Sequence, residues 1–264
     1  MTPSTSSPDV IVDLACENPQ ATAGAYETVL GGPVGSESTR WAAGLGNVVL
    51  CLRGMDETTG AAEPAAYFSV AHFRGAHFRG AHFYGEELPD ARRLLTRRGY
   101  PVVDSALGVL GETIPLGVAT PPLAAALPAG DLTGMDHLVF MCEDRNLAVA
   151  VFGGTFGLDF RLDQPIGDGA RQLFFRAGSV IVEVVSAPRP PDAPSASSPI
   201  TLWGLAWRSA DVDATHARLS VAGLDLSEIR TGRKRGTRIF TVRDRTLGIR
   251  TVVIGSDRPA TPAG

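Results

Sequence analysis

Four stretches of the chain share one order of apolar and polar positions. The clearest is 135–160, which reads MDHLVFMCEDRNLAVAVFGGTFGLDF. An apolar run typical of a strand passes into acidic and polar residues, then into apolar residues at helical spacing, and then to a glycine. Residues 202–226 repeat this order, as do 10–32 and 81–99. Each stretch therefore predicts a strand followed by a helix that a glycine ends.

Short runs of β-branched and aromatic residues follow the predicted helices. Examples are NVVLCLR at 47–53, RQLFFRAGSVIVEVV at 171–185 and TRIFTVRDRTLGIRTVVI at 237–254. Turn residues separate the runs, as between neighbouring strands. The repeating unit is therefore βαβββ, present four times, and its period of about 60 residues indicates paired modules of an α+β protein. The glycines that end the four helices are Gly31, Gly99, Gly157 and Gly223.

Two segments rich in Pro, Ala and Ser are typical of linkers, ATPPLAAALPAGD at 119–131 and SAPRPPDAPSASSP at 186–199. The first divides the chain into two halves. We predict a disordered lead, two domains of two modules each, a linker between them and a tail. Their limits are 1–8 for the lead, 9–120 for the first domain (modules 9–60 and 61–120), 121–131 for the linker, 132–256 for the second domain (modules 132–188 and 199–256) and 257–264 for the tail.

The segment 71–85 reads AHFRGAHFRGAHFYG and holds three of the five histidines of the chain. A period of five places His72 and His77 on opposite faces of a strand, or about 140° apart on a helix. Histidines at this spacing do not form a compact chelate from one regular element. We interpret the repeat as a tandem expansion, held in an extended loop or hairpin at the start of the second module. His82 is the only one of the three that we keep, as a remote site candidate.

The composition is that of a soluble globular protein, because 44% of the 264 residues are hydrophobic and 20% are charged. A formal net charge of -4 gives no electrostatic reason to expect nucleic acid or a membrane as a partner. No apolar run approaches the roughly 20 residues that span a bilayer. The N-terminus, MTPSTSSPD, does not resemble a signal peptide, so we expect a cytoplasmic protein. The three cysteines lie far apart, which predicts buried thiols and no disulfide.

Two polar side chains stand out in apolar strands of the third module. Glu183 lies in VIVEVV, where a carboxylate costs free energy unless a cation, a hydrogen-bond partner or a proton compensates it. His137 lies in MDHLVFM and alternates with apolar residues. The alternatives are a glutamate at a strand edge or paired with Arg176, and a hydrogen-bonded core histidine. Their joint occurrence in matching strands favours a shared functional site.

The four modules resemble those of the vicinal oxygen chelate superfamily, which includes glyoxalase I, extradiol dioxygenases, and fosfomycin- and bleomycin-resistance proteins. The motifs that carry the resemblance are DHLVF with Asp144 downstream, VIVEVV, and LWGLAWRSADVDATHARL. The similarity is clearest over 132–254 and weaker over 9–55 and 61–118. It implies two glyoxalase-like domains with cupped sheets of mixed parallel and antiparallel strands. It also implies metal ligands from the first and last strands of the modules.

Residue by residue, the resemblance implies that His137 and Glu183 bind a divalent metal (Zn, Ni, Mn or Fe) and that Glu183 is also the catalytic residue. The fourth module departs from the pattern. Aligning Asp144 with Asp211 places Gly204 opposite His137, and a glycine has no side chain to bind a metal.

The remaining equivalent positions supply no conventional ligand either. Val252 stands where the fourth module would carry a carboxylate, and the first module offers Ile11 and Cys51. A catalytic divalent site normally has three protein ligands and a water molecule. The third ligand would have to come from Gln172, His82 or a partner chain. A metal site and a site without any cofactor therefore both stay open.

Further residues are expected to surround a ligand in the cup of the C-terminal domain. Gly204 would leave room for a flat or bulky ligand. The basic segment RTGRKRGTR at 230–238 would bind a carboxylate or phosphate through its guanidinium groups, or would form a solvated hairpin. The candidate ligand-binding residues are Phe175, Gln172, Gly204, Trp207, Arg208, Arg233 and Arg238.

The favoured function is a small-molecule enzyme, a lyase or isomerase with its site around His137 and Glu183 in the cup of the C-terminal domain, with or without a metal ion. Oxygenation fits less well, because Gly204 stands where the extradiol pattern has a second histidine. The alternative is a metal-free protein that sequesters an aromatic or amphipathic small molecule, as bleomycin-resistance proteins do. A metal-free acid–base enzyme built on Glu183 is a third hypothesis. The expected partner is a small molecule, and the chain is expected to be a monomer or a homodimer.

The interpretation of the repeat as a tandem expansion leads to a first prediction. A variant that lacks residues 72–81 should fold and keep its ligand, because YFSVAHFYGEELPDARRLL then remains as an ordinary strand and helix. Thermal melting followed by circular dichroism, together with ligand binding, checks this outcome. Loss of folding or of binding would show that the repeat has a role of its own.

Overall fold

The computed structural model describes residues 8–37, 40–55, 64–69, 87–120, 130–188 and 198–257. The pentapeptide repeat at 71–85 and most of the predicted linker 121–131 lie outside these residues, so their interpretation stays a prediction. The two proposed domains, 9–120 and 132–256, likewise stay a prediction as units of folding.

The N-terminal half forms one sheet of eight strands, in the order β2-β3-β4-β1-β5-β8-β7-β6. Its first module consists of β1 (Val10–Cys16), α1 (Pro19–Leu30), β2 (Gly35–Glu37), β3 (Arg40–Leu45) and β4 (Val48–Gly54). Its second module consists of β5 (Ala65–Ser69), α3 (Glu87–Arg97), β6 (Val102–Asp104), β7 (Gly108–Gly111) and β8 (Leu116–Ala119).

The C-terminal half forms a second sheet of eight strands, in the order β10-β11-β12-β9-β13-β16-β15-β14. The third module consists of β9 (Leu132–Cys142), α4 (Arg145–Ala148), the π-helix η1 (Val149–Thr155), β10 (Asp159–Gly167), β11 (Ala170–Ala177) and β12 (Val180–Ser186). The fourth consists of β13 (Ile200–Ser209), α5 (Val212–Val221), β14 (Arg230–Thr231), β15 (Thr237–Val242), the 3-10 helix η2 (Arg245–Leu247) and β16 (Arg250–Ser256).

The predicted α+β fold of four βαβββ modules is confirmed. Three α-helices begin at a polar side chain that accepts a hydrogen bond from a free backbone N–H, at Asn18, Asp144 and Asp211. The four predicted helix-ending glycines all have a positive φ, which only glycine adopts without strain: Gly31 (72°), Gly99 (72°), Gly157 (66°) and Gly223 (85°). The unpredicted feature is η1, which continues the single turn of α4 with wider hydrogen bonding.

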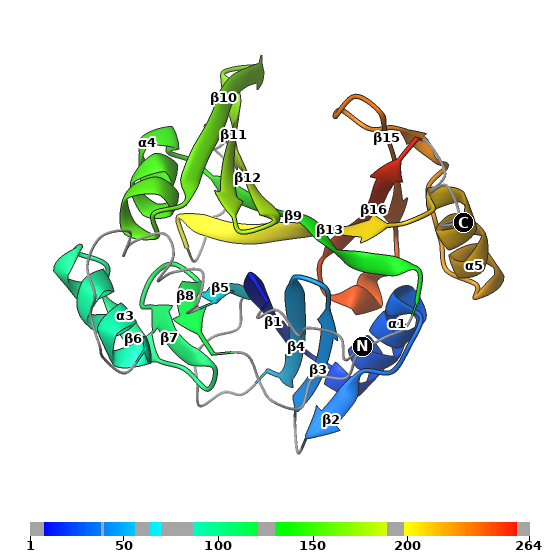
Figure 1. Ribbon diagram of the computed structural model, residues 1–264, viewed down its shortest axis with the longest axis horizontal. Coiled ribbons are helices and arrows are strands. Elements are labelled where there is room, and N and C mark those ends of the chain that lie inside the picture. The colour runs from blue at the N-terminus through cyan, green and yellow to red at the C-terminus, as the bar shows by residue number, and fades with distance from the viewer. Residues whose placement is uncertain are drawn as a thin grey trace, which may run out of the picture.

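Each sheet joins two modules through their first strands. β1 runs antiparallel to β5, and β9 runs antiparallel to β13. On its other side each of these central strands pairs in parallel with the last strand of its own module, as β1 does with β4 and β9 with β12. The sheets are therefore mixed, as predicted. Figure 1 shows the second sheet curved, with β10–β12 rising at one end, β15 and β16 at the other, and α4 and α5 outside the curve.

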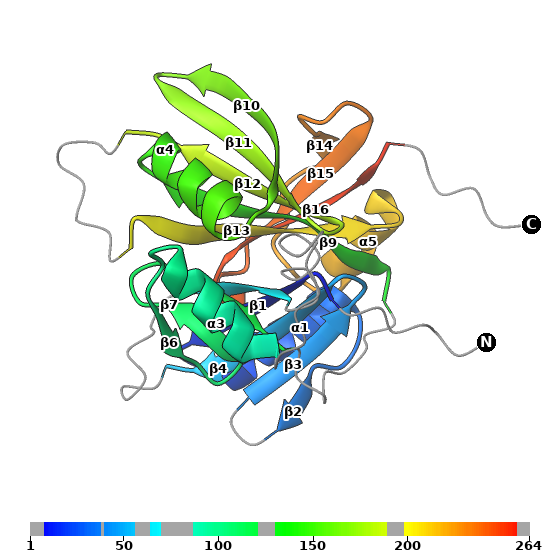
Figure 2. The ribbon, with the colours of Figure 1, turned by 60° about the vertical axis from the view of Figure 1, so that its left-hand side comes forward.

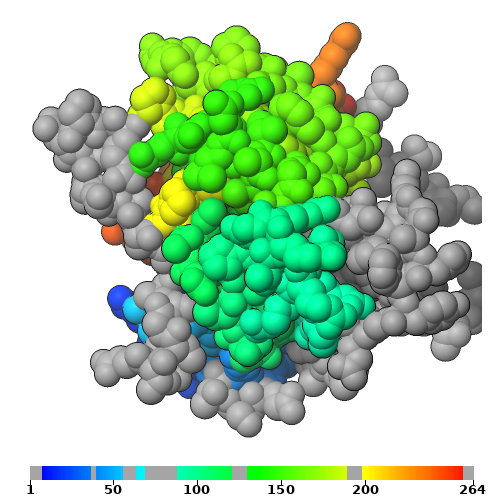
Figure 3. All heavy atoms as spheres, turned by 90° about the vertical axis from the view of Figure 1, so that its left-hand side faces the viewer, coloured from blue at the N-terminus to red at the C-terminus, as the bar shows by residue number. Residues whose placement is uncertain are grey.

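One continuous apolar core joins the two sheets. The first and fourth modules meet where Tyr26 of α1 packs edge-on against Trp207 of β13, with ring centroids 6.4 Å apart. The second and third modules meet where the ring of Phe156 contacts those of Phe68 and Tyr100, with ring centroids 5.1 and 5.2 Å apart. The ribbon in Figure 2 and the packed atoms of α3 beneath the third module in Figure 3 show the same close contact. The two halves thus bury their apolar faces against each other.

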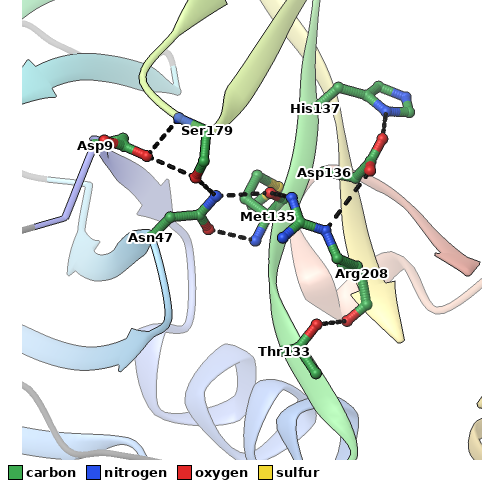
Figure 4. Close-up of polar contacts among 8 residues, drawn as sticks. All are labelled: Asp9, Asn47, Thr133, Met135, Asp136, His137, Ser179 and Arg208. Atoms are coloured by element: carbon green, nitrogen blue, oxygen red, sulfur yellow. Dashed lines mark hydrogen bonds and ion pairs between the residues drawn. The ribbon is translucent and has the colours of Figure 1, made fainter. Parts of the chain in front are cut away.

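A polar contact at the edge of this core holds β9 in place. Asn47, in the turn between β3 and β4, donates to the carbonyl oxygen of Met135 at 3.0 Å and accepts from its N–H at 2.8 Å (Figure 4). The approach requires glycine on both sides. A Cβ atom on Gly46 (φ 56°) would lie 2.4 Å from the carbonyl oxygen of Thr133, and one on Gly134 (φ 145°) would lie 2.6 Å from the side-chain oxygen of Asn47.

Two arginines add hydrogen bonds between the halves. Arg218 of α5 donates to the carbonyl oxygens of Thr28 and Val29 at the end of α1, at 2.7 and 3.0 Å. Arg98 donates to the carbonyl oxygens of Gly154 and Thr155 in η1, at 3.1 and 2.6 Å. Guanidinium groups at helix ends satisfy carbonyl groups that the helices leave unpaired. Among the described helices, none is long and apolar enough to cross a membrane.

The contact of Asn47 with Met135 leads to a second prediction. Asn47→Ala leaves both backbone groups of the fully buried Met135 without these partners, so the free energy of unfolding should fall by about 1–3 kcal/mol. Urea denaturation of the full chain measures it. The control is Asn146→Ala, an exposed asparagine of α4, which should change the value by less. Equal stability of the two variants would contradict the role given to Asn47.

Candidate functional site

The side of the second sheet that faces away from the shared core is here called the inner face. Alternation along β9 places Leu138 and Phe140 in the core, and His137 and Val139 on the inner face. Glu183 pairs with Val139 across β12 and β9, so its side chain lies on the inner face too. The two polar residues of the third module are therefore neighbours on one surface.

His137 lies between two carboxylates. Its Nδ1 is 2.9 Å from Oδ2 of Asp136, and its Nε2 is 3.7 Å from Oε2 of Glu183. With the ring proton on Nδ1 and donated to Asp136, Nε2 directs a lone pair toward the carboxylate of Glu183. Two electron-rich groups this close are favourable only when a proton or a metal ion lies between them. The arrangement is thus built to hold a cation.

Two amide side chains support Glu183 from its other side. Gln172 of β11 is buried, and its Nε2 donates to Oε1 of Glu183. Gln164 of β10 donates in turn to the amide oxygen of Gln172, at 3.0 Å. Oε1 of Glu183 is therefore satisfied by hydrogen bonding, while Oε2 faces His137.

Asp136 interacts with positive or hydrogen-bonding groups from several segments. Its hydrogen bond with His137 holds the pKa of Asp136 below the ordinary value, against the opposing effect of burial. The positive charges of Lys234 and Arg208 add to this effect. Arg208 lies with Nε 3.7 Å from Oδ1 of Asp136, and it also donates to the carbonyl oxygen of Met135 at 3.0 Å (Figure 4). Asp136 is consequently an anion at neutral pH and orients the ring of His137.

A bulge in β9 explains why Asp136 can reach its own neighbour. Ala206 of β13 pairs with His137, but the next residue, Trp207, pairs with Met135, so Asp136 is an extra residue in the strand. Strict alternation would place Asp136 and His137 on opposite faces. Asp136 could not be predicted from the sequence for this reason, because no turn or glycine signal marks the bulge within MDHLVFM.

The strand β13 carries a second bulge at the equivalent place. Beside Gly204 the pairing with β9 skips Trp203, just as the first bulge skips Asp136 beside His137. Trp203 is 42% exposed, and the guanidinium carbon of Arg250 lies 4.5 Å from its ring centroid. The pair of Trp203 and Arg250 could not be predicted from the sequence either, because Trp203 and Trp207 are four residues apart and alternation assigns both to one face.

The third and fourth modules align as the sequence predicts. Asp144 and Asp211 both cap a helix, and the same spacing relates His137 to Gly204. In each module the first strand also pairs in parallel with the last, and the corresponding residue pairs are Val139–Glu183 and Ala206–Val252. The fourth module thus offers neither a histidine nor a carboxylate at the two positions.

The first module offers no ligand pair either. Ile11 and Cys51 are buried in a smaller apolar cluster on the other face of the first sheet. Burial raises the pKa of Cys51 to about 12, so this side chain is a neutral thiol. Asp13, beside it, forms an ion pair with Arg53 at 2.9 Å. All three cysteines of the chain are buried and free, as expected.

Three predicted ligand-binding residues do not lie on the inner face. Phe175 is fully buried in the core. Its neighbour Phe174 pairs with Glu183 and lies on the inner face, so alternation directs Phe175 to the opposite side. Trp207 is fully buried against α1, and Arg238 forms an ion pair with Asp213 of α5 on the outer side of the sheet. These placements correct the expectation that they line the cup.

The other predicted residues have more favourable positions. Gln172, Gly204 and Arg208 lie on the inner face, near His137 and Glu183. Arg233 is exposed in the turn between β14 and β15. Their part in ligand binding stays a prediction.

The donors around His137 fit a metal ion only as an open site. Within the described ranges no group of three or more His, Cys, Asp and Glu side chains is placed to hold a metal. Nε2 of His137 and Oε2 of Glu183 face each other, the amide of Gln172 adjoins them, and the hydrogen bond from His137 to Asp136 is typical of metal-bound imidazoles. Water and substrate would have to supply the remaining ligands.

Comparison with known families supports the resemblance found in the sequence. Residues 136–241 match the model of the Glyoxalase/Bleomycin resistance protein/Dioxygenase superfamily. The matched range contains His137 and Glu183, and this part of the chain is similar to that superfamily. No curated protein matches the chain.

Solved structures extend the fold to the whole chain. A variant of 4-hydroxymandelate synthase from Streptomyces coelicolor matches with a TM-score of 0.64 at 15% identity, covering 98% of this chain and 94% of the synthase. Methylmalonyl-CoA epimerase from Mycobacterium tuberculosis matches with a TM-score of 0.40 at 21% identity, over 50% of this chain and 92% of the epimerase. The epimerase of Streptomyces coelicolor, in complex with 2-nitronate-propionyl-CoA, matches with a TM-score of 0.39 at 24% identity, over 48% and 99%. Of these three structures, only the synthase has a TM-score above 0.5, and at 15% identity it shows the fold and no activity.

Proposed function

We propose that the chain is an enzyme, a lyase or isomerase, that acts on a small molecule at the inner face of the second sheet. The observation that carries the proposal is the position of His137 between Asp136 and Glu183, with one ring nitrogen engaged and the other 3.7 Å from a carboxylate oxygen. A histidine with only a structural role in the sheet would not need a carboxylate on each side. The superfamily to which residues 136–241 are similar includes enzymes, in agreement with this reading.

His137 through Nε2 and Glu183 through Oε2 would hold a divalent metal ion (Zn, Ni, Mn or Fe). When bound, such an ion would act as a Lewis acid and stabilise negative charge on a substrate oxygen. Asp136 favours the tautomer of His137 whose Nε2 is free of a proton, because it accepts the hydrogen bond from Nδ1. Gln172 restrains the carboxylate of Glu183 so that Oε2 keeps its direction.

Glu183 is the residue best placed to move a proton of the substrate. Its carboxylate is partly exposed on the inner face, with 16% of the side chain accessible, and Oε1 is already occupied by Gln172. In a chain without a metal ion, Oε2 therefore remains to accept a proton from a substrate carbon and to return it at another position, as a metal-free acid–base isomerase or lyase requires. The apolar neighbours Val182 and Val184 are buried and fix the strand below.

A metal-free binding protein is the second candidate function. The observation that favours it is the fourth module, where Gly204 and Val252 replace the two ligand positions and leave half of the inner face without metal donors. Exposed apolar side chains on strands of this sheet, Leu162, Ile166 and Trp203, would contact an aromatic or amphipathic molecule.

The proposed metal site leads to a third prediction. The full chain, stripped with a chelator and dialysed against each of Zn, Ni, Mn and Fe(II), should retain one ion per chain by elemental analysis. Asp136→Asn should weaken this binding by about 10- to 100-fold, because the hydrogen bond that orients His137 becomes weaker. His137→Ala and Glu183→Gln remove ligands and should weaken it at least as much.

The matched control for the loss of a carboxylate is Glu112→Gln, at an exposed position in the turn between β7 and β8, which should bind metal as the wild type does. Stoichiometric metal in both His137→Ala and Glu183→Gln would rule out the assigned ligands. Thermal shifts with the same ions and with a library of aromatic compounds separate the two candidate functions. If the aromatic compounds stabilise the wild-type chain and the metal ions do not, the chain is the metal-free binding protein of the second candidate function.

A further inference from the structure

We propose that Arg250, held against Trp203, binds an anionic group of the ligand, so that the substrate of the site carries a carboxylate or a phosphate. This inference rests on the proposed function for the reacting end of the substrate at Glu183. It adds the chemical class of the substrate and a second point of attachment on the inner face.

The side chain of Arg250 lies on the inner face. Arg250 begins β16 and pairs with Gly204. The next residue, Thr251, is fully buried, and so is Val253, which belongs to the shared core. Alternation therefore directs Arg250 to the opposite side of the sheet, the side of Glu183.

The guanidinium group of Arg250 is positioned by an aromatic ring and not by a carboxylate. Its central carbon lies 4.5 Å from the ring centroid of Trp203. No Asp or Glu of the described ranges forms an ion pair with Arg250, whereas Arg208 and Arg238 in the same sheet each have one. A guanidinium group that lies over a tryptophan ring still has N–H groups that can bind a planar oxyanion.

Gly204 interrupts the row of side chains on the inner face. A Cβ atom added to Gly204 would lie 3.3 Å from the carbonyl oxygen of Arg250, 3.6 Å from its Cβ and 3.9 Å from the Cβ of Val139. These are the nearest atoms, and they belong to the strands on either side. Gly204 itself adds no side chain to the inner face, between Arg250 of β16 and Val139 of the third module.

The strand register sets the size of the ligand. Glu183, Val139, Gly204 and Arg250 follow one another across β12, β9, β13 and β16. Gly204 is two strands away from Glu183, which corresponds to roughly 10 Å. A small acid whose anionic group rests above Gly204 would reach Glu183 with its other end. The negative charges of Glu183 and Asp136 and the positive charge of Arg250 would orient it in one direction.

The test uses three probes that share a phenyl ring: benzoate, phenyl phosphate and the uncharged benzamide. Titration calorimetry on the full wild-type chain should show binding of at least one anion, weaker in high salt, and little binding of benzamide. Arg250→Gln should weaken anion binding by about 10- to 100-fold. Arg250→Lys should recover only part of it, because an ammonium group neither stacks nor donates in the same way.

The matched control is Arg245→Gln, an exposed arginine of η2 that changes the net charge equally and should bind the anions as the wild type does. Gly204→Val, checked by thermal melting, should also abolish binding by filling the position above the sheet. Preference for benzoate or for phenyl phosphate identifies the carboxylate or the phosphate as the bound group.

Equal binding by Arg250→Gln and Arg245→Gln overturns the proposal, and so does a wild type that binds neither anion at millimolar concentration. The outcome is separate from that of the metal site. Arg250→Gln should retain metal, and Glu183→Gln should retain the anions. A chain without metal whose anion binding depends on Arg250 keeps this inference and loses the metal-dependent function. A chain that binds metal, but whose anion binding does not depend on Arg250, loses only this inference and keeps the metal-dependent function.

Discussion

The paired hydrogen bonds between Asn47 and Met135 are the contact on which the site geometry depends. They fix the backbone of β9 one residue before the bulge at Asp136, and Arg208 donates to the same carbonyl oxygen from the other side. The turn that carries Asn47 belongs to the first sheet, whereas the residues it positions belong to the second. The N-terminal half is therefore part of the site's support, although none of its described residues lies on the inner face near His137.

The fold could be predicted because its information is repeated and local. Helix caps such as Asp144, glycines such as Gly157 and the alternation in β9 occur in more than one module, so each copy supports the others. His137 and Glu183 could be found for a related reason. A charged or polar group within an apolar strand is visible without knowing which strands are neighbours.

The rest of the site depends on register, which the sequence does not state. Phe175 could be assigned to either face until the pairing of β11 with β12 is known, and the structure pairs its neighbour with Glu183. Asp136 and Trp203 are extra residues in their strands, and alternation places such residues wrongly. Arg250 becomes meaningful only beside Trp203, because the two lie on different strands and far apart in the sequence.

The two bulges also determine where the chain can change its length. Removing or adding a single residue in β9 or β13 would turn one flank of the strand over, exposing core residues such as Leu138 and burying His137. Between β5 and α3, by contrast, the sequence holds two additional copies of a pentapeptide. The central strands must therefore keep their number of residues more strictly than their identity, whereas the proposed tandem expansion after β5 would change the length of the chain without shifting a strand register.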